Sequence, residues 1–168
     1  MKKATIIIIL ASLVNLTCFS QNEKDDKHKI GFSAALQSTN LDIMLPLKIS
    51  SKTRIIPAIM FTTAYRAGTD IGLGLMYLRY MNQEKLRPYW GIRGGVFFFN
   101  PKNSAQDNQM DFLAGLAIGG EYFISESFSI SIEPQFNYTL SDEESDRFGN
   151  MDGSSFNTGT LVKASIYF

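Results

Sequence analysis

Three ionisable residues, Arg93, Glu133 and Lys163, have the types and spacing for chemistry inside a protein. Each lies on the polar side of a segment in which polar and apolar residues alternate, about five residues from one predicted strand end. At ~3.4 Å per residue and a tilt of ~40°, all three would lie about 13 Å deep in a common interior. A carboxylate there could act as a base, but a salt-bridge cluster that fills the interior is the favoured interpretation. Arg79 and Glu121 are predicted to form a second layer nearer the rim.

The other chemical groups point to no reaction. His28 is the only histidine, and it precedes the first predicted strand. An enzyme that uses a serine and a histidine, or a metal site rich in histidine, would therefore lack its usual residue at the opposite rim. The glycines of segments 91–95 and 115–120 lie inside predicted strands, so they are not phosphate-binding loops. We predict no catalytic residue, metal or cofactor.

Acidic residues gather in one predicted loop near the end of the chain, with Arg147 as the basic residue among them. They are Asp142, Glu143, Glu144, Asp146 and Asp152. Oxygen ligands in this number could bind calcium, but their spacing does not match the EF-hand pattern. A flexible, solvated loop is the favoured interpretation.

The chain begins like an exported protein. Lys2 and Lys3 precede a short apolar run over residues 4–14, and small residues follow it. This pattern is typical of a secretory signal peptide, which we assign to residues 1–20, and a polar leader follows over residues 21–29. The apolar run is too short for a membrane-spanning helix.

Cys18 offers an alternative, because a cysteine at the end of such a leader can be acylated in lipoproteins. The residue before it is Thr17, where these sites usually have a smaller side chain, so lipidation is disfavoured. Removal of the leader would leave a mature chain without cysteine, which must be stabilised by packing and strand pairing.

Segments with a two-residue periodicity recur along the rest of the chain, and each ends in residues that favour turns. We count eight of them, at residues 30–37, 41–49, 54–66, 70–80, 87–99, 110–124, 128–138 and 158–168. Within segment 70–80 both faces are apolar, and Arg79 is the residue that suggests which face points inward. Pro46 and Pro57 each remove a ladder donor, so each needs a bulge or a strand end nearby.

The distribution of side chains between the two faces favours a membrane barrel over a soluble one. In segment 128–138, Ile130, Ile132 and Phe136 share one face and Glu133 lies on the other. The apolar set along the chain is too bulky for a narrow lumen, whereas the small and charged set fits it. A soluble sandwich or lipocalin-like barrel remains the alternative.

Loop lengths and aromatic positions support the same interpretation. Short connections at 50–53, 81–84 and 125–127 fall on one side, and longer ones at 100–109 and 141–157 fall on the other. This is the arrangement of outer-membrane barrels. Aromatic residues near the strand ends are predicted to form two interfacial girdles: Tyr65, Tyr80, Trp90, Tyr122, Phe128, Tyr138 and Phe168. We predict an all-β fold, an eight-stranded antiparallel up-and-down transmembrane β-barrel over residues 30–168.

Three stretches resemble a known family. They are the stretch from Arg87 to Gly95 (RPYWGIRGG), the stretch from Gly119 to Tyr138, and the end of the chain at the terminal Phe168. Together they are similar to the small outer-membrane β-barrel domain family, often labelled porin-like. The resemblance implies the cell outer membrane as location, outer-membrane lipid as surroundings, and the barrel-assembly machinery as a partner during insertion. The last strand is similar to the insertion signal of such proteins, with Val162, Ala164, Ile166 and Phe168 as its lipid-facing residues.

Function is less well determined than fold. The chain has 16 basic and 16 acidic residues and no basic patch, which argues against nucleic acid as a partner. An eight-stranded barrel is filled by its own side chains. We therefore expect a non-enzymatic protein that acts in envelope structure or in surface interaction through its outer loops. A porin-like passive channel for small solutes is the alternative, and an enzyme that modifies lipid or peptide is a second one.

Overall fold

The computed structural model describes residues 29–37, 40–62, 68–101, 107–145, 147–149 and 152–168. The predicted signal peptide and most of the predicted polar leader lie outside these residues. The strands are β1 (Gly31–Gln37), β2 (Asn40–Met44), β3 (Leu47–Ser50), β4 (Thr53–Thr62), β5 (Gly68–Tyr80), β6 (Leu86–Pro101), β7 (Gln109–Phe123), β8 (Phe128–Leu140) and β9 (Ser154–Tyr167). Among the described residues, no helical segment has the length and hydropathy needed to cross a membrane.

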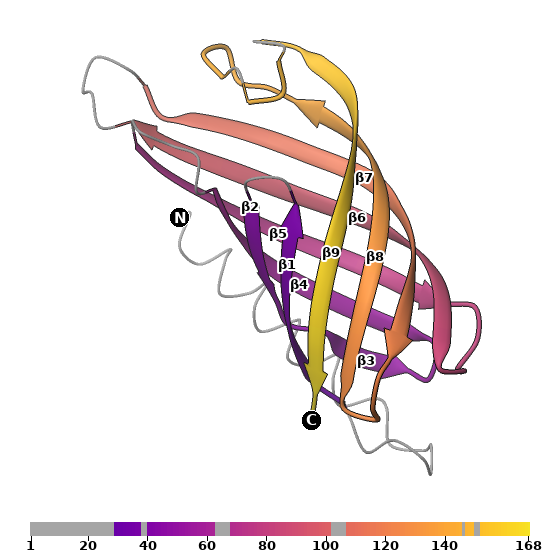
Figure 1. Ribbon diagram of the computed structural model, residues 1–168. Coiled ribbons are helices and arrows are strands. Elements are labelled where there is room, and N and C mark those ends of the chain that lie inside the picture. Colours follow the sequence, from indigo (N-terminus) through magenta and orange to yellow (C-terminus); the bar gives the residue numbers. More distant parts are fainter. Residues whose placement is uncertain (1–28, 38–39, 63–67, 102–106, 146, 150–151) are drawn as a thin grey trace.

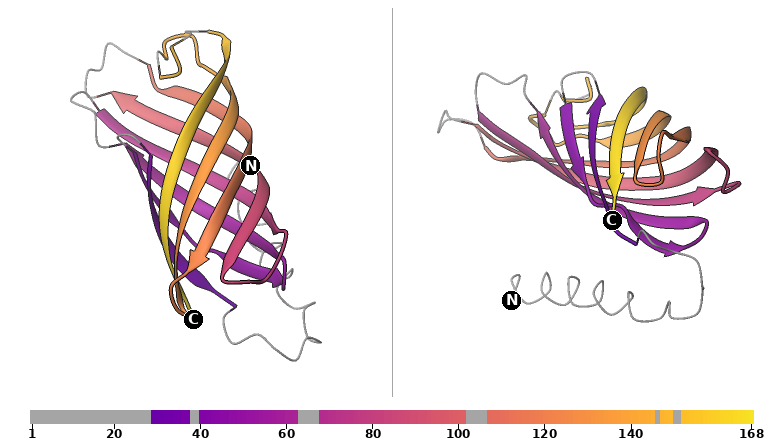
Figure 2. Two further views of the ribbon diagram at one scale, coloured as in Figure 1. Left: turned by 45° about the vertical axis from the view of Figure 1, so that its right-hand side comes forward. Right: turned by 60° about the horizontal axis from the view of Figure 1, so that its bottom comes forward.

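The strands form one closed antiparallel sheet (Figures 1 and 2). Neighbours in sequence pair from β4 to β9, and the ring closes where β9 pairs with β1. β2 and β3 both pair with β4, so they are two parts of a single wall strand. The wall therefore has eight positions, and the predicted eight-stranded antiparallel barrel is confirmed.

Pro46 lies at the break between β2 and β3. Its ring removes a donor, but its carbonyl accepts a hydrogen bond from the amide of Gly31 at 2.8 Å. On the other side, the amide of Leu45 donates to the carbonyl of Pro57 at 2.9 Å. The ladder is thus continuous around the proline, which stands at a strand end as the sequence requires.

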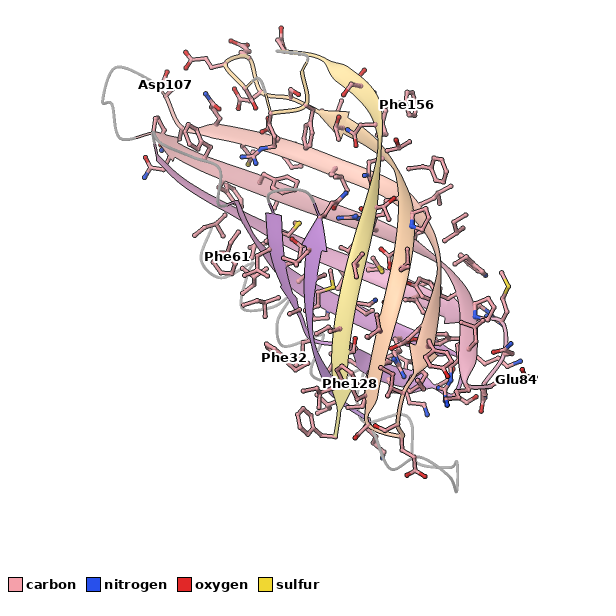
Figure 3. The ribbon with its side chains drawn as sticks, viewed as in Figure 1. Phe32, Phe61, Glu84, Asp107, Phe128 and Phe156 are labelled. Atoms are coloured by element: carbon pink, nitrogen blue, oxygen red, sulfur yellow. The ribbon has the colours of Figure 1, made fainter. Side chains whose placement is uncertain are left out.

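The two faces of the wall are as predicted. Ile130, Ile132 and Phe136 are 41%, 56% and 53% exposed on the outside, whereas Glu133 is completely buried inside. Phe32, Phe61 and Phe156 project away from the wall in the same way (Figure 3). A soluble barrel would bury these side chains in its interior, so this orientation favours a membrane barrel over the soluble alternative.

The two ends of the barrel differ. At one end, here called the turn end, short connections at 51–52, 81–85 and 124–127 join the strands, and Phe168 donates its amide to the carbonyl of Ile30 at 2.8 Å. The longer connections lie at the other end, the loop end. Figure 3 labels Glu84 at the turn end and Asp107 at the loop end.

The last hairpin is longer than predicted. β9 begins at Ser154, where the sequence pattern placed its start at Thr158, because Ser154 to Asn157 continue the ladder opposite Asn137 to Leu140. These added residues extend the β8–β9 hairpin at the loop end, so the acidic loop is shorter than predicted.

Candidate functional site

Glu133 stands at the centre of the lumen and is held by three side chains. Its Oε2 accepts a hydrogen bond from the Tyr89 hydroxyl at 2.9 Å, and its Oε1 accepts one from Gln135 Nε2 at 2.8 Å. Lys163 Nζ lies 3.8 Å from Oε2. Glu133 and Lys163, two members of the predicted charge network, therefore form an ion pair. We call Tyr89, Glu133, Gln135 and Lys163 the central plug.

Arg93 lies in the lumen beside a small cavity. The cavity has a volume of about 20 Å³, and Asp42, Met60, Met76 and Arg93 are among its lining residues. Within the described part of the chain, Arg93 Nη1 and Asp42 Oδ1 have no hydrogen-bond partner. A space of this size with polar groups on its wall holds about one water molecule. Asp42 is a lumen residue outside the predicted charge network.

The second charged layer is centred on Glu121, close to the turn end. Arg54 Nη1 lies 3.4 Å from Glu121 Oε2, and the hydroxyls of Tyr80, Ser129 and Tyr167 also donate to this carboxylate. The Arg54 guanidinium lies 4.1 Å from the centroid of the Tyr167 ring and 5.0 Å from that of Tyr80. We call these five residues the turn-end cluster.

The prediction for Arg79 was wrong, because its side chain is exposed on the outer face. The adjacent Tyr80 points inward and joins Arg54, so it belongs to no outer girdle. Arg79 is the last outward residue of β5, where an outer-face cation costs far less than at the membrane midplane. Arg54, which lies at the same depth on β4, was not among the residues predicted for this layer.

Apart from Tyr80, some of the residues predicted for the two aromatic girdles are exposed on the outer face. Trp90, Tyr122, Tyr138 and Phe168 are exposed, Phe128 is half-buried, and Tyr65 lies outside the described residues. Val162, Ala164, Ile166 and Phe168 are all exposed on the outer face of the last strand and its end. Their role as an insertion signal stays a prediction.

Part of the acidic loop folds over the mouth at the loop end, which differs from a fully solvated loop. Asp111, at the top of β7, accepts hydrogen bonds from the Asp142 amide at 3.0 Å, Ser145 Oγ at 2.7 Å and Arg147 Nε at 2.9 Å. Phe148 packs on Phe97, with 5.9 Å between the ring centroids. We call Asp111, Asp142, Ser145, Arg147 and Phe148 the loop-end cap.

Two of the other acidic residues of this loop contribute backbone hydrogen bonds: the Asp152 amide donates to the Asp142 carbonyl at 3.0 Å, and the Glu144 carbonyl accepts from Gln109 Nε2 at 3.0 Å. Glu143, Glu144 and Asp152 are exposed, and Asp146 lies outside the described residues. In the part of the chain that the structure describes, no group of three or more histidine, cysteine or acidic residues is placed to hold a metal ion.

Replacing Asp111 with alanine is expected to release the cap. Ser145, Arg147 and the Asp142 amide would all lose their acceptor, so the loop should open locally while the barrel stays closed. Limited proteolysis of the folded protein should then cut within residues 141–153 at least about tenfold faster, which corresponds to a local loss of ~1.4 kcal/mol. An exposed loop residue is the control, since Glu143→Ala should leave the cleavage rate unchanged. Equal rates for both variants would contradict the anchoring role.

Comparison with known proteins identifies the fold class. No protein-family model and no curated protein matches the sequence. The fold matches the N-terminal β-barrel domain of Pseudomonas aeruginosa OprF, with a TM-score of 0.60, 12% identity, and coverage of 83% of this chain and 95% of that one. It also matches Neisserial surface protein A (NspA), with a TM-score of 0.54, 14% identity, and coverage of 83% and 93%. The chain thus has the fold of small eight-stranded outer-membrane barrels.

Proposed function

We propose that this chain is a non-enzymatic integral protein of the cell outer membrane. Its lumen is filled by side chains, and it acts in envelope structure or in surface interaction through its outer loops. The observation that carries this proposal is the central plug, because Glu133 is completely buried in the lumen, where it accepts two hydrogen bonds and pairs with Lys163. The exported leader and the barrel-assembly machinery as a partner belong to the same proposal.

The outer face supports the location in a membrane. Large apolar side chains cover it around the whole wall, including Phe32, Ile59, Leu73, Ile92 and Leu116, which are each more than two-fifths exposed. Contact of such a continuous apolar belt with hydrocarbon is favourable, whereas its exposure to water would be unfavourable. Short connections face the periplasm in proteins of this fold, so we assign the turn end to the periplasm and the loop end to the cell surface.

The loop-end cap supports a closed mouth. Phe148 joins Met60, Phe97 and Leu113 in an apolar cluster at the loop end, and Arg147 lies 4.8 Å from the centroid of the Phe97 ring. A solute entering from the surface would first meet this cluster and then the central plug. Two successive layers, one apolar and one charged, favour a structural role over a passive channel.

The position of the buried carboxylates argues against catalysis in the lumen. Glu133 and Glu121 each accept from several side chains and are shielded from solvent, so neither is poised to take a proton from an incoming substrate. An enzyme that modifies lipid or peptide would need its groups near the rim. The exposed acidic residues of the outer loop, Glu143, Glu144 and Asp152, are better suited to contact a cationic surface partner.

Conductance in planar lipid bilayers tests the filled lumen. The wild-type protein is expected to give no stable solute-permeable openings, and Glu133→Gln is expected to give none either. The substitution should instead lower the free energy of unfolding by about 1.5–3 kcal/mol, because charge-assisted hydrogen bonds weaken and Lys163 loses its counter-charge. Glu126→Gln, at an exposed turn residue, is the matched control and should change neither quantity. Stable openings in the wild type, or a permeability that changes with Glu133, would favour the channel instead.

A further inference from the structure

Basic and aromatic residues share the outer face of the turn end, over strands β4 to β7. Arg79 is exposed at the end of β5 and lies directly opposite Trp90 of β6 in the ladder. Tyr77, two residues earlier on the same face, has its ring centroid 6.1 Å from that of Trp90. These three side chains therefore form one contiguous outward patch near the edge of the wall.

Two lysines flank this patch. The carbonyl of Lys52 accepts the Tyr80 amide at 2.8 Å, which places the exposed Lys52 beside the end of β5. On the other side, Lys85 Nζ lies 5.1 Å from the centroid of the Tyr122 ring, which is exposed on β7. We call Lys52, Tyr77, Arg79, Lys85, Trp90 and Tyr122 the basic collar.

Among the described residues, the two ends differ in the sign of their net exposed charge. Exposed basic side chains of the collar lie at the turn end, where Glu84 and Glu126 are the exposed acidic residues among those described. The exposed charged residues described at the loop end are acidic, namely Asp107, Glu143, Glu144 and Asp152. Over the described part of the chain, the collar thus gives the turn-end interface a net positive outer surface, which favours an anionic ligand there.

The depth of Arg79 identifies what kind of anion can reach it. Arg79 is the second-to-last residue of β5. Its guanidinium therefore lies at the interface between hydrocarbon and headgroups, where a cation on the outer face costs about 0–1 kcal/mol. The planar guanidinium matches a phosphate with two parallel hydrogen bonds. Tyrosine and tryptophan rings at this depth contact the glycerol and upper acyl region of lipids.

We propose that the basic collar binds the phosphate group of an anionic glycerophospholipid in the leaflet at the turn end. Arg79 holds the phosphate, Lys52 and Lys85 supply the additional positive charge, and Tyr77 and Trp90 contact the lipid below the headgroup. The proposal rests on the proposed function in one respect, since the barrel must span a bilayer.

Trp90 is the only tryptophan of the chain, so its fluorescence reports on this one site. The full mature barrel is folded into phosphatidylcholine vesicles that contain a minor fraction of acyl-brominated phosphatidylglycerol, a quencher. We expect quenching that corresponds to an occupancy about fivefold above that given by the same fraction of brominated phosphatidylcholine, as one interfacial charge provides. Salt should reduce this excess, because the attraction is electrostatic.

Substitutions separate a site from a general surface potential. In Arg79→Gln the two brominated lipids should quench Trp90 almost equally. Arg79→Lys should give an intermediate excess for phosphatidylglycerol, because lysine keeps the charge but cannot make the two parallel hydrogen bonds of the guanidinium. Lys29→Gln removes one charge at the same end, beside β1 and four wall positions from β6, and should leave the excess unchanged. If Arg79→Gln does not fold, Arg79→Lys takes its place in the comparison with Lys29→Gln.

The outcomes distinguish this inference from the proposed function. A barrel that inserts, is quenched by brominated phosphatidylcholine, and shows no excess for phosphatidylglycerol overturns the lipid site alone. An excess that falls equally in Arg79→Gln and Lys29→Gln also overturns it, because it then reflects only the charge of that end. A chain that does not enter the bilayer, so that neither lipid quenches Trp90, overturns the proposed function as well.

Discussion

Replacing Glu121 with alanine is expected to lower the free energy of unfolding by about 3–5 kcal/mol. Arg54 would remain buried, only 6% exposed, without its charge partner. The hydroxyls of Tyr80, Ser129 and Tyr167 would lose their shared acceptor at the same time. Urea titration of the protein folded in detergent micelles measures the change, with the heat-dependent shift on a gel as a check that the barrel has closed.

Two further variants identify the cause of that loss. Glu126→Ala removes an exposed carboxylate from the neighbouring turn and should change the free energy of unfolding by no more than about 0.5 kcal/mol. The double variant Arg54→Met with Glu121→Leu removes both buried charges and should recover the part of the stability that the unpaired Arg54 costs, while the three hydroxyls still lack their acceptor. A loss below about 1 kcal/mol for Glu121→Ala would show that the turn-end cluster does not stabilise the barrel.

The fold could be predicted because a membrane barrel constrains its sequence on both faces. Ile130, Ile132 and Phe136 must meet hydrocarbon, and Glu133 must avoid it, so a one-residue shift would be costly in either direction. The alternation is therefore strict in the middle of each wall strand. Short turns and long loops then fix which strand ends share a side.

The charged residues near strand ends could not be placed by the same argument. Arg79 was assigned to the lumen because segment 70–80 has apolar residues on both faces, and one charge appeared to decide between them. At the interface the membrane penalty almost disappears, so a cation is tolerated on either face and carries no information about orientation. The pairing of β5 with β6 would have decided the orientation of Arg79, because Arg79 lies opposite Trp90, which is exposed on the outer face.

The loop-end cap was missed for a different reason. Ser145 and Arg147 lie in a stretch whose composition is typical of a solvated loop, and nothing local marks Ser145 as buried. Its burial depends on Asp111, which is 34 residues away in the sequence and reaches the loop only because β7 begins at the loop end. Contacts of this kind follow from tertiary structure and leave no periodic signal.

Gly119→Val is expected to destabilise the barrel by about 3 kcal/mol or more, whereas Gly120→Val should have little effect. A Cβ at Gly119 would lie 2.6 Å from both the Ile132 carbonyl oxygen and Tyr89 Cζ, so it would displace the hydroxyl that donates to Glu133. Overpacking costs about 1–3 kcal/mol, and loss of a hydrogen bond to a charged group about 1.5–3 kcal/mol. The fraction of folded barrel on a gel and the urea midpoint both measure this loss.

The adjacent glycine provides the control because it lies on the other face of the same strand. A Cβ at Gly120 would lie 3.6 Å from Leu86 Cδ1, an ordinary contact, and valine there would add apolar surface on the lipid side. We expect a change within about 0.5 kcal/mol. Similar losses for the two variants would mean that valine acts through the strand backbone, and the stability of the barrel would then not depend on the close approach that seats Tyr89 against Glu133.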